Sequence, residues 1–322
     1  MKKIRVGIVG GAGYTGGELI RILINHSGVE IAFVQSRSQA GKSIAAVHTD
    51  LIGDTNLQFV DSMQSDVDVI FLCVAHGAAK DIVKNIAKNI KIIDLSANFR
   101  LKTNEESDFI YGLPEFNREK IKTAKNISNP GCFATSIQLA LIPLAVHGLL
   151  KNQINIQSTT GSTGAGIGLS ETSHFSWRQN NLSIYKPFTH QHLGEIHQTL
   201  KELQPDFAAD ISMIPQRGAF TRGIFTSIIL ENNLSIESIF TLYSNYYNNH
   251  PFVHISEINI DLKQVVNTNK CIIYLEKHEN KLLIISMIDN LIKGASGQAV
   301  QNMNLLFGLD ETTGLKLKAT AF

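Results

Sequence analysis

The sequence has no excess of charge of either sign. Its 29 Lys and Arg residues nearly balance its 28 Asp and Glu residues, which leaves a formal net charge of +1. Proteins that bind nucleic acid electrostatically usually carry a clear basic excess on the binding domain. We therefore expect no nucleic-acid partner.

Long hydrophobic runs are absent as well. No apolar stretch approaches the roughly 20 residues that a bilayer-spanning helix needs. The N-terminal sequence MKKIRVGIVGG is a poor secretion signal, because glycines break its apolar run and Glu18 and Arg21 follow it. These features predict a cytoplasmic protein with no membrane partner.

Cysteine occurs only three times, as Cys73, Cys132 and Cys271, at positions far apart in the chain. An odd number of widely spaced cysteines forms neither a disulfide framework nor a zinc cluster, so we expect a reduced protein without a metal site. Cys73 and Cys271 lie in the strand-like runs VIFLCV and CIIYL and are predicted to be inert core residues.

Cys132 differs from the other two, because it follows the turn sequence Asn-Pro-Gly and precedes a run of small and apolar residues with a helical pattern. Unpaired N–H groups and the dipole at a helix N-terminus lower the pKa of a thiol and favour the thiolate. Cys132 could therefore be a nucleophile. It could equally be a small apolar residue that begins a core helix, and its local sequence leaves both alternatives open.

The first half of the chain alternates short apolar runs with helical patterns. Strands are predicted at Ile4–Val9, Val29–Val34, Val67–Val74 and Lys91–Ser96, with helical sequences such as Gly16–Asn25 and Ala78–Asn89 between them. Because these strands show no alternation of polar and apolar residues, both faces of their sheet should be covered. The pattern predicts a doubly wound α/β domain.

The pattern of predicted strands and helices changes from Ile154 onward. Strand-like runs then succeed one another with fewer helices between them, which predicts a mixed or antiparallel sheet in an α+β domain. The last segment, from Gly294, returns to a helical pattern.

A glycine-rich turn follows the first predicted strand. Within GIVGGAGYTGGEL, the glycines Gly10, Gly13 and Gly16 lie between the strand and a helix. Glycines let the backbone approach a pyrophosphate, which then lies at the helix N-terminus. The turn predicts a dinucleotide site that includes Tyr14 and Thr15; a tight strand-to-helix turn without a ligand is the alternative.

The end of the second predicted strand bears on the choice of nucleotide. An NAD site would show an acidic residue about twenty residues beyond the glycines, but the sequence there is Gln35-Ser36-Arg37-Ser38. An arginine between serines suits a 2′-phosphate, so NADP is the predicted cofactor. A solvated surface arginine is the alternative.

Two histidines and a carboxylate lie within the segment THQHLGE. His192 and Glu195 are three residues apart at the start of a predicted helix, so the carboxylate could orient the imidazole. A metal site is not expected, because no cysteine or further carboxylate joins the cluster at ligand spacing. An exposed polar loop is the alternative.

A segment rich in glycine and hydroxyl residues, Thr159–Gly168, follows a predicted strand. Such a segment suits anion binding through backbone N–H groups, here those of residues 161–166. A flexible linker loop is the alternative.

Five segments together resemble the N-acetyl-γ-glutamyl-phosphate reductase family of arginine biosynthesis: GYTGGEL, DLSANFRL, NPGCFAT, HQHLGEI and KGASGQAVQNMNLLFGLDETTGL. The resemblance extends from about Ile4 to Leu315. It implies an α/β dinucleotide-binding domain formed by residues 1–131 and 294–322, with an inserted α+β catalytic and dimerisation domain formed by residues 132–293. It also implies a homodimer or a homotetramer.

The resemblance further implies NADPH-dependent reduction of an acyl phosphate, with Cys132 forming a thioester, His192 as the acid/base and Glu195 in support. Arginines Arg100 and Arg222 would hold phosphate or carboxylate, because a guanidinium binds such groups with two hydrogen bonds. The predicted cofactor-binding residues are Gly10, Gly13, Tyr14, Thr15, Gly16, Ser36, Arg37, Ser38, Gly164, Asn290 and Gly294, and the predicted substrate-binding residues are Ser96, Arg100, Asn129, His190 and Arg222.

Three alternatives remain open at this point. The substrate could be an N-succinyl-glutamyl or N-acyl-aminoadipyl phosphate in place of the N-acetyl compound. The chain could be an aspartate-semialdehyde dehydrogenase, which shares the architecture and the cysteine chemistry. It could also be a non-catalytic NADP-binding regulator in which Cys132 is only a core residue.

Overall fold

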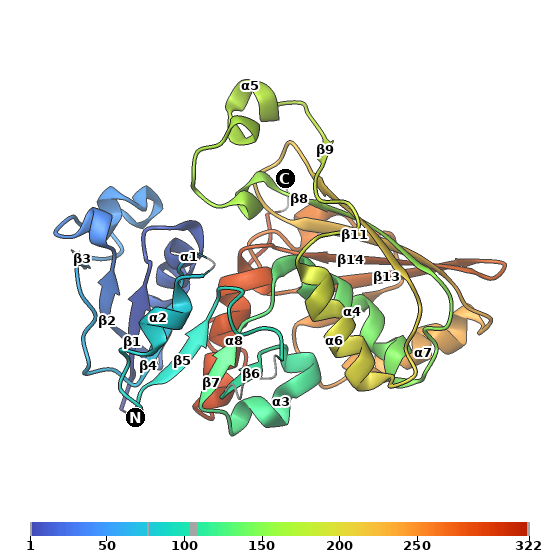
Figure 1. Cartoon of the computed structure of the whole chain (residues 1–322), viewed down its shortest axis with the longest axis horizontal. Coiled ribbons are helices and arrows are strands. Elements are labelled where there is room, and N and C mark those ends of the chain that lie inside the picture. The colour runs from blue at the N-terminus through green and yellow to red at the C-terminus, as the bar shows by residue number, and fades with distance from the viewer. Residues whose placement is uncertain (1, 76, 103–107, 321–322) are drawn as a thin grey trace. The chain divides into compact units, whose positions relative to one another are not determined.

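The structure is a computed structural model of the 322-residue chain and describes residues 2–75, 77–102 and 108–320. The chain divides into two compact units, which are drawn in Figure 1. The first holds Met1–Pro130 and Ala295–Lys316, and the second holds Gly131–Gly294 and the C-terminal residues from Leu317. The first division lies one residue before the predicted boundary, and the second lies one residue after it. The tail from Leu317 was predicted in the first domain but groups with the second unit.

The first unit is built on a seven-stranded sheet with the order β3-β2-β1-β4-β5-β7-β6. Its strands are β1 (Ile4–Val9), β2 (Val29–Gln35), β3 (Phe59–Val60), β4 (Val69–Leu72), β5 (Lys91–Asp94), β6 (Phe109–Tyr111) and β7 (Asn126–Ser128). All neighbouring strands are parallel, which confirms the predicted doubly wound sheet. The strand order reverses between β1 and β4, and ligands of such sheets bind at the carboxyl ends of the strands beside this point.

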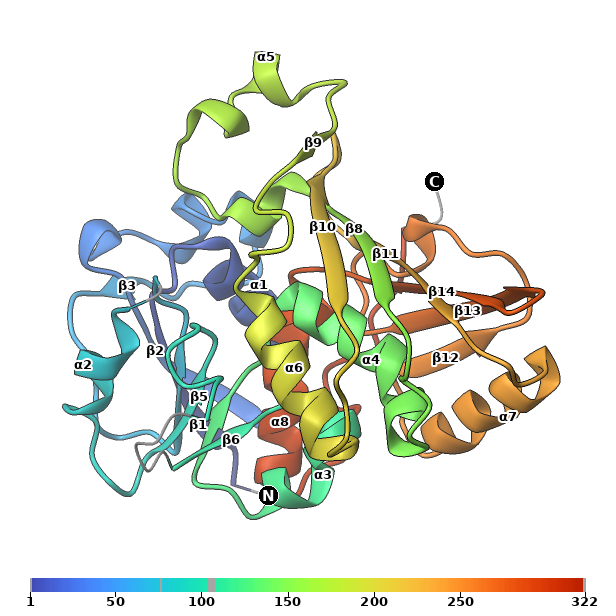
Figure 2. The same cartoon turned by 45° about the vertical axis from the view of Figure 1, so that its right-hand side comes forward.

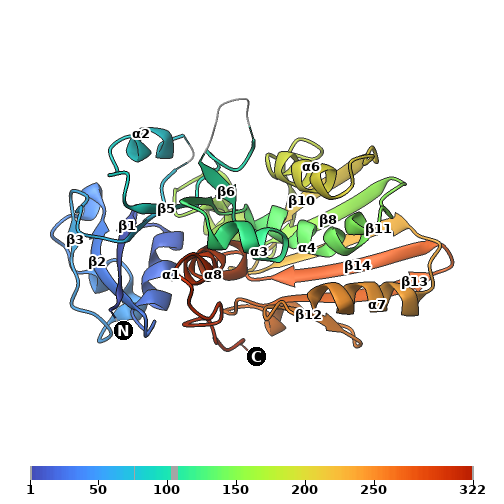
Figure 3. The ribbon, with the colours of Figure 1, turned by 90° about the horizontal axis from the view of Figure 1, so that it is seen from below.

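The helices of the first unit come from both ends of the chain. They are α1 (Tyr14–Leu23), α2 (Ala79–Val83), α3 (Pro114–Lys122) and α8 (Gly297–Leu306), with the short 3-10 helices η1 (Arg37–Gln39), η2 (Ile44–Ala46) and η3 (Thr49–Leu51). Helix α8 is buried along its whole length and packs against α1 and α3; Figure 3 shows α1 and α8 side by side. The C-terminal segment is therefore part of the core of the first unit.

Helix α2 is shorter than predicted. The sequence predicted a helix over residues 78–89, but α2 ends at Val83 and the chain continues in turns. The N–H groups of Asn85 and Ile86 donate to carbonyls three residues earlier, and not four as in an α-helix. These tighter turns bring the buried Ile90 to the start of β5.

The second unit is built on a mixed seven-stranded sheet with the order β12-β13-β14-β11-β8-β10-β9. Its strands are β8 (Ile154–Thr160), β9 (Ser183–Ile184), β10 (Ile211–Arg217), β11 (Ile224–Glu231), β12 (Val253–Ser256), β13 (Cys271–His278) and β14 (Lys281–Ile288). The pairs β8–β10 and β12–β13 are parallel and the other pairs are antiparallel, which confirms the predicted α+β character.

Helix α4 (Cys132–Val146) is the central helix of the second unit. It packs on β14 and β11 and lies beside α6 (His192–Leu203) and α7 (Ile236–Tyr247), as Figure 2 shows for α6. Every residue from Phe133 to Ala145 is buried. Because neighbours cover α4 all round, its sequence is mostly apolar and carries no amphipathic stripe.

The segment between β8 and α6 contains the short helices η4 (Ser162–Ala165), η5 (Glu171–Ser173) and α5 (Phe175–Arg178) as well as β9, which pairs with β10. The part around α5 stands away from the sheet of the second unit (Figure 2). Two further short helices, η6 (Leu262–Gln264) and the π-helical turn η7 (Ile292–Ser296), flank β13 and β14 in the chain. In the part of the chain that the structure describes, no helix has the length and apolar character needed to cross a membrane.

Candidate active site

The glycine turn of the first unit forms as predicted between β1 and α1. Gly10 has a φ of +83°, and a Cβ there would meet the Cys73 carbonyl oxygen at 2.4 Å. A Cβ at Gly16 would meet the Gly11 Cα at 2.6 Å. The turn itself therefore requires glycine at positions 10 and 16.

Gly13 has no such requirement within the protein. Its φ is −84°, and a Cβ there would meet nothing nearer than the Gly10 carbonyl oxygen at 3.9 Å. It is the N-cap of α1 and offers no side chain to the first N–H groups of that helix, which Tyr14 and Thr15 begin. Open space in front of an uncapped helix start is what a pyrophosphate needs, so these residues fit the phosphates of a dinucleotide.

The segment after β2 lies at the carboxyl edge of the same sheet. Ser36 is buried, whereas Arg37 and Ser38 are exposed in η1. Among the described residues, none forms an ion pair or hydrogen bond with the Arg37 guanidinium. The guanidinium is thus available to a phosphate at the end of the second strand.

The predicted substrate residues Ser96 and Arg100 lie just beyond β5. The Ser96 hydroxyl donates to Asp94 Oδ2 at 2.7 Å, and its N–H donates to Oδ1 at 3.0 Å. Arg100 is buried, and its Nη2 donates to the Leu95 carbonyl at 2.8 Å. Burial raises the pKa of Asp94, while the Ser96 hydrogen bonds and the Arg100 charge act in the opposite direction. Whether these residues touch substrate stays a prediction.

Asn129, another predicted substrate residue, is only 1% exposed. Its Nδ2 donates to the Ala295 carbonyl at 3.1 Å, and its Oδ1 accepts from Asn302 Nδ2 at 3.1 Å. Its backbone N–H donates to the Asp94 carbonyl at 2.7 Å. These contacts hold β7 and α8 together within the first unit, and a contact of Asn129 with substrate stays a prediction.

Cys132 is the first residue of α4, as predicted from the sequence. It is half-buried, and Gly131 precedes it as an N-cap without a side chain. Cys73 is also half-buried rather than a core residue as predicted, but burial of its thiol raises its pKa to about 12, and Cys271 is fully buried. Among the three, Cys132 alone combines partial access with the N–H groups of a helix start, which stabilise a thiolate.

His192 lies directly against the residue before Cys132. A Cβ at Gly131 would meet His192 Nε2 at 2.3 Å, so the imidazole packs on the backbone at that point. His192 is buried and is the first residue of α6, where the sequence predicted a helix to begin. Within residues 2–75, 77–102 and 108–320, no three His, Cys, Asp or Glu side chains are grouped so that they could hold a metal ion.

Glu195 holds the start of α4 more firmly than it holds His192. Its Oε2 accepts from the Gly131 N–H at 2.9 Å, whereas its Oε1 is 3.9 Å from His192 Nε2, which is too long for a hydrogen bond. The Glu195 carbonyl accepts from Gln138 Nε2 at 2.9 Å. Glu195 and Gln138 thus join α6 to α4, a contact that the spacing of His192 and Glu195 did not predict.

His190 packs edge-on against His192, with ring centroids 4.6 Å apart, and its Nδ1 accepts from the His192 N–H at 3.2 Å. Burial, with a smaller contribution from the charge of Lys186, lowers the pKa of His190 to about 4. The imidazole is therefore neutral near pH 7. Because Nδ1 accepts, the hydrogen-bond pattern assigns the proton to Nε2, so His190 can donate a hydrogen bond from that atom.

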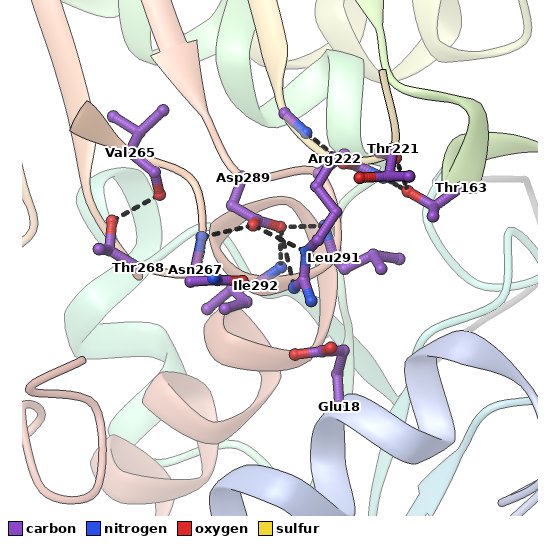
Figure 4. A network of polar contacts seen from close by, with 12 residues as sticks. Glu18, Thr163, Thr221, Arg222, Val265, Asn267, Thr268, Asp289, Leu291 and Ile292 are labelled. Carbon is purple, nitrogen blue, oxygen red and sulfur yellow. Dashed lines mark hydrogen bonds and ion pairs between the residues drawn. The ribbon is translucent and has the colours of Figure 1, made fainter. Parts of the chain in front are cut away.

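A buried carboxylate, Asp289, forms an ion pair with Arg222 in the second unit (Figure 4). Asp289 follows β14, is fully buried, and accepts from Arg222 Nε at 3.1 Å and Nη2 at 3.3 Å. It also accepts from the backbone N–H groups of Asn267, Leu291 and Ile292. The predicted substrate residue Arg222 is therefore tied to Asp289, and its contact with substrate stays a prediction.

Asn290 and Gly294 shape the same region. Asn290 Oδ1 accepts from the Gly223 N–H at 2.7 Å, and its Nδ2 donates to Thr163 Oγ1 at 3.0 Å. A Cβ at Gly294 would meet the Cys132 Cβ at 2.8 Å, so glycine is required where the π-helical turn passes the cysteine. Their predicted cofactor contacts, and that of Gly164 in η4, stay predictions.

Most backbone N–H groups of the segment after β8 are already paired within the protein. Five N–H groups of this segment donate to backbone carbonyls, namely those of Gly161, Ser162, Thr163, Gly164 and Gly166. The first three reach carbonyls of residues 220–223, so the segment is paired with the turn before β11. The prediction that these amides bind an anion is not supported for those five, because each already donates to a backbone carbonyl.

Comparison with family models identifies both units. Residues 5–124 match the model described as semialdehyde dehydrogenase, NAD binding domain, and residues 132–290 match semialdehyde dehydrogenase, dimerisation domain. The chain belongs to the semialdehyde dehydrogenase family. Within this family member the NAD binding match lies in the first unit and the dimerisation match in the second.

Curated relatives of this semialdehyde dehydrogenase family member carry the name N-acetyl-gamma-glutamyl-phosphate reductase. Those of Phocaeicola vulgatus and Bacteroides thetaiotaomicron are 57% and 56% identical, each over 99% of this chain and 100% of the relative. The relative from Flavobacterium johnsoniae is 55% identical with the same coverage. These relatives confirm the resemblance that the sequence motifs indicated.

Solved structures with the same fold have low sequence identity to this chain. Aspartate semialdehyde dehydrogenase II from Vibrio cholerae, complexed with ASA, has a TM-score of 0.75 and 16% identity over 96% of this chain and 99% of that chain. Aspartate semialdehyde dehydrogenase with NADP from Candida albicans has a TM-score of 0.70 and 17% identity over 95% and 99%. At these identities the likeness shows the fold alone.

Two residues near Cys132, Tyr185 and Arg217, were not identified from the sequence. Burial raises the pKa of Tyr185, and its ring lies 6.5 Å from the ring of Phe133, the residue after Cys132. The Arg217 guanidinium lies over the Tyr185 ring, 4.7 Å from its centroid. The sequence could have indicated Arg217, because it is the last residue of the strand ISMIPQR. The alternation of side chains along that strand places this charged residue on the buried face.

Proposed function

We propose that the protein reduces N-acetyl-γ-glutamyl phosphate to N-acetylglutamate semialdehyde with release of phosphate, as a step of arginine biosynthesis. The observation that carries the proposal is the half-buried Cys132 at the uncapped start of α4, with His192 packed on the residue before it. Relatives up to 57% identical over their full length carry the name of this reductase. The match of the second unit to a dimerisation domain supports a homodimer or homotetramer, and the predicted cytoplasmic location stays a prediction.

Cys132 begins the reaction. Its thiolate attacks the acyl carbon, a C–S bond forms, the bond from that carbon to the phosphate oxygen breaks, and phosphate leaves. The N-terminal N–H groups of α4 stabilise the thiolate before the attack. Glu195 keeps the Gly131 N–H oriented, so the start of α4 keeps its position while the thioester forms.

The first unit supplies the site for the reductant. Gly13 and the start of α1 would hold the pyrophosphate, and Arg37 with Ser36 and Ser38 would hold a 2′-phosphate. NADPH, when bound, supplies the hydride that reduces the thioester carbon.

His192 moves the proton. After reduction, an oxyanion remains on the carbon bonded to Cys132, and His192 gives it a proton to form a thiohemiacetal. His192 takes this proton back as the C–S bond breaks, so that the semialdehyde leaves and the thiolate returns. His190, neutral and protonated on Nε2, donates a hydrogen bond to an oxygen of the reacting group, which suits its lowered pKa.

The test is an assay in the reverse direction, with NADP, phosphate and one semialdehyde at a time. The N-acetylglutamate, N-succinylglutamate and N-acetylaminoadipate semialdehydes separate the possible acyl substrates, and aspartate semialdehyde tests the alternative suggested by the shared fold. We expect turnover with N-acetylglutamate semialdehyde, and none with aspartate semialdehyde; turnover with the N-succinyl or the aminoadipate compound alone would show that the acyl substrate is a different one. Turnover with aspartate semialdehyde alone would overturn the proposal.

Cys132→Ser is the matched control for this assay. A serine hydroxyl is hardly ionised near neutral pH, so turnover should fall by several orders of magnitude while NADP still binds. A serine variant that keeps more than a small residual activity would contradict the nucleophile assignment. Wild-type protein that binds NADP but turns over none of the semialdehydes would instead favour the non-catalytic regulator.

The cofactor preference is tested with the same reactants. We expect wild-type protein to prefer NADP to NAD, and Arg37→Ala to lose about ten- to a hundredfold of that preference in kcat/KM, as one or two charge-assisted hydrogen bonds would provide. Unchanged preference in the variant would show that Arg37 is a solvated surface residue.

A further inference from the structure

Strands β8 and β10 end side by side, and their last residues carry polar groups toward the helix-covered face of the sheet. The two strands are parallel, and their final paired residues are Thr160 and Arg217. Paired residues of neighbouring strands point to the same face. That face is the buried one, because Ile154, Ile156 and Ser158 alternate with exposed residues along β8 and lead to the buried Thr160.

Both side chains hold a buried polar atom without a hydrogen-bond partner among the described residues. These atoms are Arg217 Nε and Thr160 Oγ1, and Thr160 is only 1% exposed. In native proteins nearly all buried polar atoms are paired, so two orphaned atoms at neighbouring strand ends need an explanation. None of the described acidic residues forms an ion pair with Arg217.

The position of Arg217 is held by other residues. Arg178 Nη1 donates to the Arg217 carbonyl at 2.6 Å, and the Arg217 guanidinium lies over the Tyr185 ring at 4.7 Å from its centroid. The guanidinium is therefore oriented in advance by stacking, while its Nε hydrogen-bond donor stays unused.

Tyr185 connects this arginine to Cys132. Burial and, to a smaller extent, the Cys132 charge raise the pKa of the Tyr185 phenol, whereas the Arg217 charge and a hydrogen bond with the Arg217 side chain act on it in the opposite direction. The Tyr185 ring also lies 6.5 Å from the ring of Phe133, the residue after Cys132. Arg217, Tyr185 and Cys132 are thus neighbours within the second unit.

The other arginines of this region have partners. Arg222 is tied to the Asp289 carboxylate. Arg178 uses its three nitrogens on Thr172, Arg217 and Ser183. Arg217 is therefore the guanidinium of this group that retains an unused buried donor.

We propose that Arg217, with the Thr160 hydroxyl beside it, binds an anionic group of the substrate next to Cys132 and so helps to determine which acyl phosphate is accepted. A guanidinium oriented by stacking binds carboxylate and phosphate with charge-assisted hydrogen bonds. The proposal rests on the proposed function. The anion can be the transferred phosphate, the α-carboxylate of the glutamyl group, or a carboxylate on an acidic N-acyl group such as succinyl.

Alkylation of Cys132 tests the proposal without any turnover. The rate constants for iodoacetate, an anion, and iodoacetamide, its neutral analogue, are measured at Cys132 by peptide mass spectrometry. We expect Arg217→Gln to lower the iodoacetate-to-iodoacetamide ratio by about tenfold, the loss expected for one charge-assisted hydrogen bond, and Arg217→Lys to lower it less. Lys151→Gln, which removes an exposed positive charge near the opposite end of β8, should leave the ratio unchanged.

Steady-state kinetics in the reverse direction identify the anion. If Arg217 binds phosphate, Arg217→Gln raises the KM for phosphate by about ten- to a hundredfold; if it binds the α-carboxylate, the KM for every N-acylglutamate semialdehyde rises instead. If it binds an acidic acyl group, only the KM for the N-succinyl compound rises. Thr160→Val, which removes the hydroxyl and keeps the shape, should raise the same KM by a smaller factor.

The outcomes separate this proposal from the proposed function. An unchanged alkylation ratio in Arg217→Gln, or unchanged KM values for all reactants in a variant that turns over, would overturn the role of Arg217. Wild-type protein that turns over no semialdehyde would overturn the proposed function, and the alkylation ratio would still decide whether Arg217 attracts anions to Cys132.

Discussion

Single side chains of the second unit determine how Cys132 is presented. Glu195 accepts the Gly131 N–H at 2.9 Å from 64 residues away in the chain, and both groups are buried. A carboxylate that accepts a backbone N–H at a helix start forms a strong, charge-assisted hydrogen bond. We therefore regard Glu195 as a positioning residue for the start of α4, in addition to its predicted effect on His192.

The hydrogen bond that Glu195 accepts from Gly131 can be tested separately from the negative charge of Glu195. Glu195→Gln keeps an oxygen that can accept from Gly131, whereas Glu195→Ala leaves that buried N–H unpaired at a cost of about 1–3 kcal/mol. We expect the alanine variant to lose both free energy of unfolding and kcat, and the glutamine variant to lose much less stability. Urea unfolding and kcat measurements on both variants provide the check. Equal loss of stability in the two variants would contradict the positioning role.

His190 makes a defined contribution to the pH dependence of stability. Folding lowers its pKa from 6.5 to about 4, so between these values the unfolded chain binds more protons than the folded chain. The free energy of unfolding is therefore fully retained above pH 6.5 and falls as the pH drops towards 4. Between pH 7.5 and pH 5 the loss from this one residue is about 2 kcal/mol.

Urea unfolding at pH 7.5 and pH 5 measures this contribution. His190→Asn keeps a hydrogen-bond acceptor near the His192 N–H but cannot titrate, so the loss of stability between the two pH values should shrink by about 2 kcal/mol. His278→Asn, at the exposed end of β13, serves as the control and should show the wild-type loss. A His190→Asn variant that loses as much stability as wild type would contradict the lowered pKa.

At the scale of elements, the turn between β1 and α1 contains glycines with different roles. Gly16 packs against the Gly11 backbone, whereas Gly13 contacts nothing that would exclude a side chain. Packing within the protein explains the first, whereas the second is consistent with the predicted approach of a ligand to the start of α1.

This difference predicts that one substitution mainly lowers stability and the other mainly weakens NADP binding. Gly16→Ala should lower the free energy of unfolding by about 1–3 kcal/mol through overpacking. Gly13→Ala should cost at most about 1 kcal/mol, the difference between these residues at an N-cap, yet weaken NADP binding by about tenfold or more through loss of space at the phosphates. Unfolding curves and NADP titrations of both variants, with Gly168→Ala as a control where a Cβ meets nothing, are the measurements. Unchanged NADP affinity in Gly13→Ala would argue against a phosphate at this helix.

At the scale of the whole molecule, the first unit is assembled from two segments that are more than 160 residues apart in the chain. Helix α8 is buried against α1 and α3, and Asn302 of α8 donates to the Gly112 carbonyl and to Asn129 Oδ1. A ligand that binds only the folded state stabilises the whole cooperative unit that carries its site.

Hydrogen exchange tests this arrangement. Saturating NADP should slow exchange of the slowest amides in β1, α1 and α8 together, because all three belong to the unit that carries the glycine turn. Exchange rates are measured by mass spectrometry with and without NADP. If α8 kept its exchange rate while β1 and α1 gained protection, the two segments would not form one cooperative unit.

Local features of the chain were predictable from sequence alone. The strands β1, β2, β4 and β5 lie where apolar runs predicted them, and α4 begins at Cys132 as the Asn-Pro-Gly turn indicated. Each of these features depends on residues within a few positions of one another, where backbone preference and burial pattern act together. Helix α2 shows the limit of such patterns, because turns ended it early.

Only the tertiary structure decided which distant side chains meet. Gly131 with Glu195, Arg222 with Asp289, and Arg217 with Tyr185 are pairs brought together by strand register and by the packing of α4 against α6. No periodicity predicts such pairs, because a side chain's partner depends on which strands are neighbours and where each one ends. Sequence therefore determined the family, the α/β and α+β character of the two halves and the cysteine at a helix start, whereas the partners that hold and surround that cysteine follow from long-range packing.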